Sequence, residues 1–195
     1  MDYSLSFQEE NGFDDTVKKY LKVAEQGDAE AQFNLGEYYN NDNGTNQNYE
    51  EAVKWYRKAA EQGHVRAQYQ LGVCYFLGFK GVKQDYKESE KWYRKSAEKG
   101  FSDAQYGLGT VLYLKRNYKE AVYWFRKAAE QGDVGAQFSI AVCYCGGRGV
   151  EKNYEEAIKW FRKAAEQGDD SAKIELEKTL KRKNRTEAKI SMEHS

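Results

Sequence analysis

The chain has 195 residues, 32% of them charged and none of them proline, a composition that suits helices with solvated outer faces. Its 31 basic and 31 acidic side chains cancel, so no overall field favours nucleic acid or an anionic membrane as a partner. The sequence contains no apolar run of about 18 residues, which excludes a membrane-spanning helix.

The chain begins with a lead segment at 1–12, which is acidic and lacks the apolar stretch of a secretory signal. The three cysteines, Cys74, Cys143 and Cys145, are odd in number and lack metal-ligand spacing, which fits a reducing compartment better than a disulfide framework. We therefore expect a cytoplasmic protein, with secretion without a cleavable signal as the alternative.

Two alternating motifs occupy the rest of the chain, and each predicts a helix. The first, helix A, reads EQGDAEAQFNLGEYY from Glu25 and recurs from Glu61, Glu98, Glu130 and, in decayed form, Glu166. The second, helix B, reads NYEEAVKWYRKAA from Asn48 and recurs from Asp85, Asn117 and Asn153. Length varies only in the A-to-B loops, as packed helices require. The motifs predict an all-α, right-handed superhelical solenoid of helix-turn-helix repeats.

The recurrence predicts the organisation of the chain. In chain order we expect a half-repeat at 13–27, full repeats at 28–63, 64–100, 101–132 and 133–168, a capping helix at 169–183 and a flexible tail at 184–195. Polar residues mark both ends, because Lys19 stands where the other B helices carry tryptophan and Glu177 stands where most A helices carry glycine. Such ends are typical of solenoid caps, and we expect a monomer.

The ends of the helices have recognisable signals. Each B helix starts with a good N-cap residue that is followed three positions later by glutamate, as in a capping box: Asn48, Asp85, Asn117 and Asn153. Aspartates can cap the A helices at Asp28, Asp133 and Asp169. The period-marking glycines are expected to end the B helices in the left-handed conformation: Gly27, Gly63, Gly100, Gly132 and Gly168.

A glycine also lies inside three A helices, at Gly36, Gly72 and Gly109. Because glycine costs about 1 kcal/mol relative to alanine in a helix interior, we expect a close approach of helix B there, through small residues such as Ala52, Ser89 and Ala121. A further row of residues can belong to the core or face a partner, and its near uniformity favours the core: Phe33, Tyr69, Tyr106 and Phe138.

The patterns A-x-x-x-L-G-x-x-Y in helix A and A-x-x-W-[YF]-x-x-A-A-x-x-G in helix B resemble the Sel-1-like repeat family, a tetratricopeptide-like group. The resemblance covers about 13–183. It implies a partner-binding adaptor without catalytic chemistry, as in degradation, envelope signalling and host-contact complexes. Leu112 departs from the helix A tyrosine, and Ala141 from its glycine.

Helix A lines the concave surface in tetratricopeptide-like solenoids, and by that analogy the variable positions of helix A are our candidate partner-binding residues. They would form a groove with an apolar centre, suited to an extended peptide or an amphipathic helix. The candidates are Glu37, Asn40, Val73, Phe76, Leu77, Thr110, Tyr113, Leu114, Val142 and Cys145.

Catalysis finds little support in the residues. The only histidines are His64 and His194, so no histidine cluster can form, and we expect no metal, cofactor or catalytic residue. Ser96 and Lys99 match the S-x-x-K signature of penicillin-recognising enzymes, but neither S-D-N nor K-T-G follows. Penicillin binding or hydrolase activity is the least favoured alternative, after an exported effector or host-contact factor. The GGRG stretch at 146–149 lacks the P-loop Lys-Ser/Thr and predicts a turn.

Overall fold

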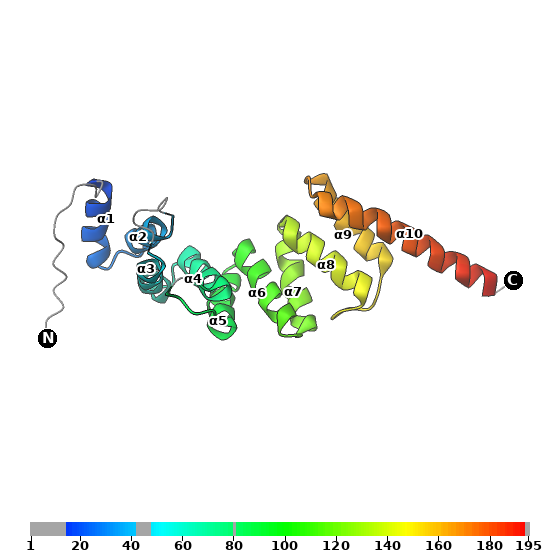
Figure 1. Cartoon of the computed structure of the whole chain (residues 1–195), viewed down its shortest axis with the longest axis horizontal. Helices are drawn as coiled ribbons and strands as arrows, with labels where there is room; N and C mark the ends of the chain where they lie inside the picture. The colour runs from blue at the N-terminus through cyan, green and yellow to red at the C-terminus, as the bar shows by residue number, and fades with distance from the viewer. Residues whose placement is uncertain (1–14, 42–47, 80, 194–195) are drawn as a thin grey trace.

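The computed structural model describes residues 15–41, 48–79 and 81–193, which form ten helices and no β-strand. The lead segment at 1–12 lies outside them. Each helix packs against the next, and the array is elongated, with α1 and α10 at opposite ends (Figure 1). The helices are α1 (Asp15–Glu25), α2 (Ala29–Asn41), α3 (Tyr49–Glu61), α4 (Val65–Leu77), α5 (Tyr86–Ala97), α6 (Ser102–Leu114), α7 (Tyr118–Glu130), α8 (Val134–Gly146), α9 (Tyr154–Glu166) and α10 (Asp170–Glu193).

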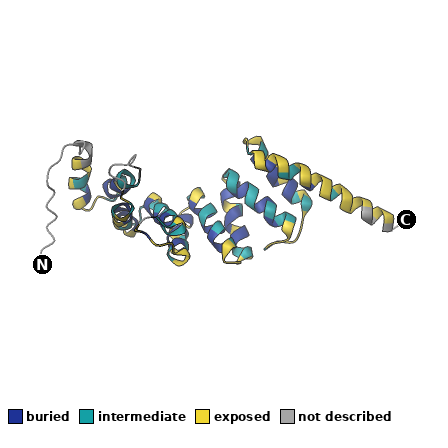
Figure 2. Cartoon of the chain, viewed as in Figure 1, coloured by how far each residue is buried: buried dark blue, intermediate teal, exposed yellow. Residues whose placement is uncertain are grey.

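The predicted all-α solenoid is therefore confirmed. Helices α2, α4, α6 and α8 are the A helices, and α3, α5, α7 and α9 are the B helices that complete each hairpin. The half-repeats at the two ends are α1 and α10. Buried residues lie mainly on the parts of the helices that face a neighbouring helix, while the described residues in the second half of α10 are mostly exposed (Figure 2).

The capping predictions hold with one exception. The side chains of Asn48, Asp85 and Asn153 accept hydrogen bonds from backbone N–H groups in the first turns of α3, α5 and α9. Asn117 does not cap α7, because its Nδ2 donates to Glu120 Oε2 at 2.7 Å instead. It follows Arg116, which takes a φ of 63° in the short loop after α6. The five period-marking glycines have φ between 89° and 99°, as predicted.

The prediction for the glycines inside the A helices is wrong about the main neighbour. An aromatic ring of the following B helix lies against each glycine, from the residue after the tryptophan. A Cβ at Gly72 would lie 2.3 Å from Tyr93 Cδ1, and Gly36 and Gly109 face Tyr56 and Phe125 in the same way. Small residues share the seam, since Ser89 Oγ donates to the Gly72 carbonyl at 2.8 Å. The glycine thus makes room for a ring.

A row of buried glutamines ties successive hairpins together. Gln32, Gln68, Gln105 and Gln137 each donate through Nε2 to a backbone carbonyl at the end of the preceding B helix. Three of them also accept from a glutamine one repeat further along: Gln62 donates to Gln32, Gln131 to Gln105 and Gln167 to Gln137. The side-chain amides of this row therefore have hydrogen-bond partners for both nitrogen and oxygen in three of the four glutamines.

The last helix extends beyond its predicted end. Helix α10 continues to Glu193, so the prediction that it stops at 183 before a flexible tail is wrong. The physical reason is that no glycine or proline interrupts 170–193, while Lys183 forms ion pairs with Glu155 of α9 and with Glu187 one turn later. The buried side chains of α10 lie in its first half, at Ala172 and Thr179.

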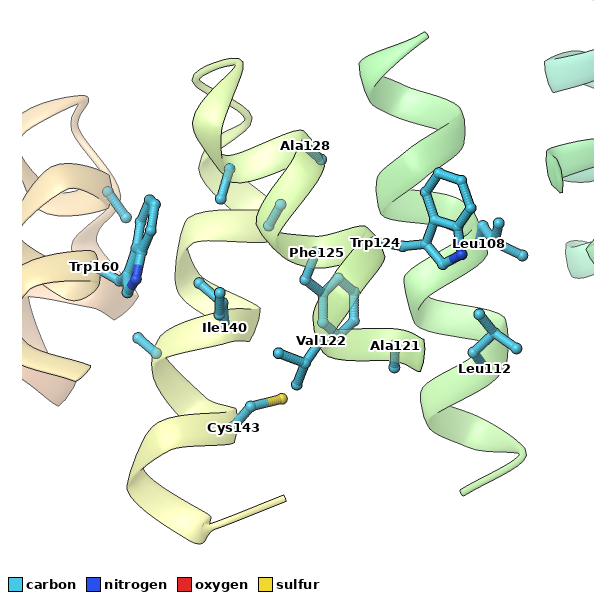
Figure 3. Close-up of a cluster of buried hydrophobic side chains, with 14 of the residues drawn as sticks. Leu108, Leu112, Ala121, Val122, Trp124, Phe125, Ala128, Ile140, Cys143 and Trp160 are labelled. Atoms are coloured by element: carbon cyan, nitrogen blue, oxygen red, sulfur yellow. The ribbon is translucent and has the colours of Figure 1, made fainter. Parts of the chain in front are cut away.

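The largest described core spans α5 to α10 and brings side chains of successive repeats together. Figure 3 shows its central part, in which Leu108 and Leu112 of α6, Trp124 and Phe125 of α7, and Ile140 and Cys143 of α8 are buried. Leu112, which departs from the usual tyrosine, is 2% exposed and thus fills a core position. This packing fixes the spacing between α6 and α8, where the candidate site lies.

Candidate functional site

The A helices α6 and α8, with α7 behind them, line an open pocket of about 190 Å³. Four of the ten predicted site residues line it: Thr110, Tyr113, Leu114 and Val142. Its other lining residues are Tyr106, Phe125, Phe138 and Ser139. Three predicted positions on α6 and one on α8 therefore meet at one pocket.

The pocket wall is aromatic and aliphatic. The Phe125 ring lies between two tyrosines of α6, with ring centroids 5.9 Å from Tyr106 and 6.3 Å from Tyr113. The Thr110 hydroxyl donates to the Tyr106 carbonyl at 3.0 Å, so this polar group is already satisfied within the helix. Such a wall favours the binding of an apolar group.

A positive charge lies next to Tyr113, one of the pocket residues. Arg148, in the turn after α8, donates a hydrogen bond to the Tyr113 hydroxyl, and its guanidinium carbon lies 5.7 Å from the centroid of that ring. The predicted turn at GGRG is present, and Gly147 ends α8 with a φ of 66°. This turn therefore contributes a cation beside the pocket that sequence reasoning missed.

The predicted residues of α4 lie outside this pocket. Leu77 is 52% exposed at the end of α4, in the position that Leu114, 53% exposed, takes in α6. Phe76 is half-buried against Tyr86, with ring centroids 5.7 Å apart, and Val73 is half-buried against the largest core. These three residues extend the apolar surface but are not brought together with the pocket.

The remaining predicted residues contact other helices. Glu37 of α2 accepts from the Tyr56 hydroxyl at 2.5 Å and from Gln70 Nε2 at 2.8 Å, so its carboxylate links α2, α3 and α4. Asn40 is half-buried. Cys145 Sγ lies 3.5 Å from the Thr179 hydroxyl of α10. For Glu37 and Cys145 the contacts indicate packing between repeats.

The aromatic row, for which the sequence allows either the core or a partner-facing position, divides in two. Phe33 is 1% exposed and belongs to the core, whereas Tyr69, Tyr106 and Phe138 are half-buried. Tyr106 and Phe138 line the pocket. The signal that could have identified them is their position one turn before Thr110 and Val142 on the same helix face.

A larger open depression of about 780 Å³ lies beside the loop between α4 and α5. Two acidic and two basic side chains line it, so neither sign of charge dominates: Glu50, Lys54, Lys83 and Asp85. None of its residues was predicted as a site. The smaller pocket has the more uniform chemistry, and it is our candidate site.

The repeats can be compared with known proteins. A family model described as Sel1 repeat matches residues 29–64, 65–101, 102–133 and 134–169. The chain belongs to the Sel1 repeat family. The matched Sel1 repeats begin one residue after the repeats predicted from the sequence. Repeats of this fold generally mediate protein–protein interaction and are generally not catalytic.

Solved structures with the same fold include a protective antigen present in uropathogenic Escherichia coli strains, which displays an SLR fold. It is 39% identical, with a TM-score of 0.78 over 83% of this chain and 35% of that one. A Sel1 repeat protein from Oxalobacter formigenes is 40% identical, with a TM-score of 0.72 over 80% of this chain and 65% of its own. The chain thus spans less than two thirds of either protein.

A third structure, YrrB, is described as a TPR protein with an unusual peptide-binding site. It is 25% identical, with a TM-score of 0.64 over 86% of this chain and 85% of that one. A search of curated proteins finds no match. None of the helices within the described ranges is long and apolar enough to cross a membrane.

The groups considered for catalysis hold structural positions in these Sel1 repeats. Ser96 is fully buried and donates to the Val65 carbonyl at 3.0 Å, where a β-lactam cannot reach it. His64 caps α4, since its Nδ1 accepts from the Ala67 N–H at 3.1 Å, while Nε2 lies 3.0 Å from Glu30. His194 lies outside the described residues. Across 15–41, 48–79 and 81–193, no group of three or more His, Cys, Asp or Glu side chains could hold a metal ion.

The cysteines are free thiols. Cys74 and Cys143 take equivalent positions in two Sel1 repeats and are buried in the core. Burial raises the pKa of the Cys74 thiol to about 12 and that of Cys143 to about 11, because a buried thiolate loses its hydration. The two thiols are therefore protonated near neutral pH and act as small packing residues.

Proposed function

We propose that this protein is a non-catalytic scaffold that binds a peptide or protein segment in the concave groove formed by its A helices. The observation that carries the proposal is the apolar pocket between α6 and α8, on the helix face that varies between repeats. A peptide could lie across α4, α6 and α8 and place one side chain in the pocket. The exposed Leu77 and Leu114 would contact it on either side.

The charges of the chain support a protein as the partner. Basic and acidic side chains are equal in number, so the affinity for nucleic acid or an anionic membrane should be low. We infer that the protein acts as a monomer in the cytoplasm. The peptide-binding site named for YrrB, which has the same fold, is consistent with this use of the repeats.

The test works with an unidentified partner. A phage-displayed peptide library is selected on the immobilised full chain, and the recovered peptides are measured by fluorescence anisotropy. Leu114→Asp places a charge at the pocket mouth, and we expect it to weaken binding about tenfold or more. Tyr123→Asp on α7 is the matched control, because Tyr123 is also 53% exposed and is not a pocket residue.

The outcomes are clear. Binding that falls with Leu114→Asp and survives Tyr123→Asp supports the groove, provided that both variants keep the helical circular dichroism of the parent. If both variants bind equally well, the groove is not the binding surface. If no peptide is recovered, the proposed scaffold function is wrong for short linear partners.

A second candidate is an exported host-contact role. One observation favours it, namely the 39% identity to a protective antigen of uropathogenic strains. Immunodetection in washed cells and in culture supernatant separates the two proposals. Protein confined to the cytosolic fraction would exclude the exported role.

A further inference from the structure

The chemistry of the bound side chain can be inferred by comparing three equivalent junctions between repeats. At each junction, the residue after the helix B tryptophan projects between two A helices. This residue is Tyr56 at the first junction, Tyr93 at the second and Phe125 at the third. The inference rests on the proposed function and specifies what the pocket accepts.

At the first two junctions the ring carries a hydroxyl that occupies the junction. The Tyr56 hydroxyl donates to Glu37, and Gln70 of the next repeat reaches the same carboxylate. Tyr93 lies so close to α6 that a Cβ at Gly107 would be 2.8 Å from its Cζ atom. The outer end of the tyrosine thus meets a carboxylate at the first junction and α6 at the second.

At the third junction the same positions hold smaller groups. Phe125 has no hydroxyl, Thr110 replaces Glu37, and Ser139 replaces Gln70. These three residues all line the pocket of about 190 Å³. An apolar protein cavity of about 150 Å³ is large enough to bind benzene. The pocket therefore has room for one aromatic ring.

Charged side chains lie towards the two ends of α6 and α8, outside the pocket lining. Arg148 lies at the Tyr113 end, is exposed, and has no carboxylate partner in the described part of the chain. Asp103 and Asp133 lie at the opposite ends of α6 and α8, near their first turns. A ligand with a negative group on the Arg148 side would complement this arrangement, since a guanidinium that hydrogen-bonds only a neutral hydroxyl favours a carboxylate.

We propose that the pocket binds the uncharged aromatic side chain of a partner segment, with a carboxylate next to that side chain on the Arg148 side. Phe125, Thr110 and Ser139 determine that a ring fits, and Arg148 selects the neighbouring charge. Aromatic anchors in well-enclosed pockets commonly dominate such interfaces.

Three small probes test the two parts of the proposal on the ¹⁵N-labelled full chain. N-acetylphenylalanine carries both the ring and the carboxylate, its amide lacks the charge, and N-acetylalanine lacks the ring. We expect N-acetylphenylalanine to shift the amide signals of α6 and α8 with a dissociation constant on the order of millimolar. The amide should bind about twofold to fivefold more weakly, and N-acetylalanine should cause no shift at the same concentration.

Two variants close the pocket with residues that the chain already uses elsewhere. Phe125→Tyr copies Tyr56 and places a hydroxyl near Thr110, the position that Glu37 takes in the first repeat. Ser139→Gln copies Gln70. Both should abolish the shifts by N-acetylphenylalanine while keeping the melting temperature near that of the parent. Ser139→Gln keeps the test decisive if Phe125→Tyr folds poorly.

Arg148→Gln tests the charge, and Arg185→Gln on the exposed part of α10 is its control. Only Arg148→Gln should bring the affinity for N-acetylphenylalanine down to that for its amide. Unchanged binding to Phe125→Tyr and Ser139→Gln would overturn the proposal, as would equal binding of N-acetylalanine. If Leu114→Asp weakens the binding of library peptides but Phe125→Tyr does not, the proposed groove is supported and the proposed aromatic anchor is wrong.

Discussion

The replacement Lys99→Gln should stabilise the protein, because it repairs the one incomplete step of the glutamine row. Gln68 is 3% exposed, and its Oε1 has no hydrogen-bond partner among the described residues. At the other three steps a glutamine one repeat further along donates to this oxygen. The equivalent residue here is Lys99, whose Nζ donates to the Gly63 carbonyl at 2.7 Å instead.

The size of the effect follows from the glutamines that take the same position in the next two repeats. Gln131 and Gln167 each reach both a glycine carbonyl, at 3.2 Å, and a buried glutamine oxygen, at 2.7 Å and 2.9 Å. Glutamine at position 99 should thus keep the bond to Gly63 and add one to Gln68. A net intramolecular hydrogen bond contributes about 1 kcal/mol, which in a chain of this size raises the melting temperature by about 2–4 °C.

Thermal and urea denaturation, followed by circular dichroism at the helix band, measure this change. Lys181→Gln on exposed α10 is the control for loss of a positive charge. The reverse change, Gln131→Lys, should lower the free energy of unfolding by a similar amount, because it leaves Gln105 Oε1 without its donor. If Lys99→Gln is no more stable than Lys181→Gln, the assigned role of the glutamine row is wrong.

Three further predictions concern the close contact at a helix glycine, the caps of two B helices and the reactivity of the cysteines. Gly72→Ala should lower the free energy of unfolding by more than about 2 kcal/mol, since its Cβ would meet the Tyr93 ring. Gly100→Ala has open space and should cost only the strain of a φ of 89°. Urea denaturation compares the two variants. Asn153→Ala should lose about 1 kcal/mol of cap energy, whereas Asn117→Ala should lose much less because Asn117 does not cap its helix; equal losses would contradict this interpretation. In native protein at pH 8, iodoacetamide should modify Cys145 before Cys74 and Cys143, because both buried thiols have a raised pKa; mass spectrometry of the peptides identifies the adducts.

The buried thiols should also make the free energy of unfolding decrease at alkaline pH. The pKa of Cys74 is raised to about 12 in the folded state, above that of an unfolded thiol at about 8.5. The free energy of unfolding is therefore highest below the pKa of the unfolded thiol. It falls as the pH rises towards the pKa of the folded thiol, because only the unfolded state loses its proton in this range. Cys74→Ala should therefore make the stability less dependent on pH between about 9 and 12, which urea titrations at several pH values measure.

The order of the helices and their pairing into hairpins could be predicted from the amino-acid pattern alone. The motif from Glu25 and the motif from Asn48 alternate, and caps such as Asp85 and glycines such as Gly63 mark where most helices start or stop. These signals are local, because each depends on residues within one or two turns. They failed at Asn117, which has the same capping pattern as the other B helices but follows the short loop with Arg116, and at the end of α10, where no glycine or proline marks a stop.

Which positions of the repeat form a pocket became apparent only from the packing of neighbouring repeats. Thr110, Phe125 and Ser139 are ordinary variants of positions in three different helices, and only their meeting between α6 and α8 leaves about 190 Å³ open. The same holds for Gln68, whose missing partner is explained by Lys99, 31 positions later. A repeat period fixes which residues are equivalent, whereas volumes and unpaired atoms depend on the particular side chains that neighbouring repeats bring together.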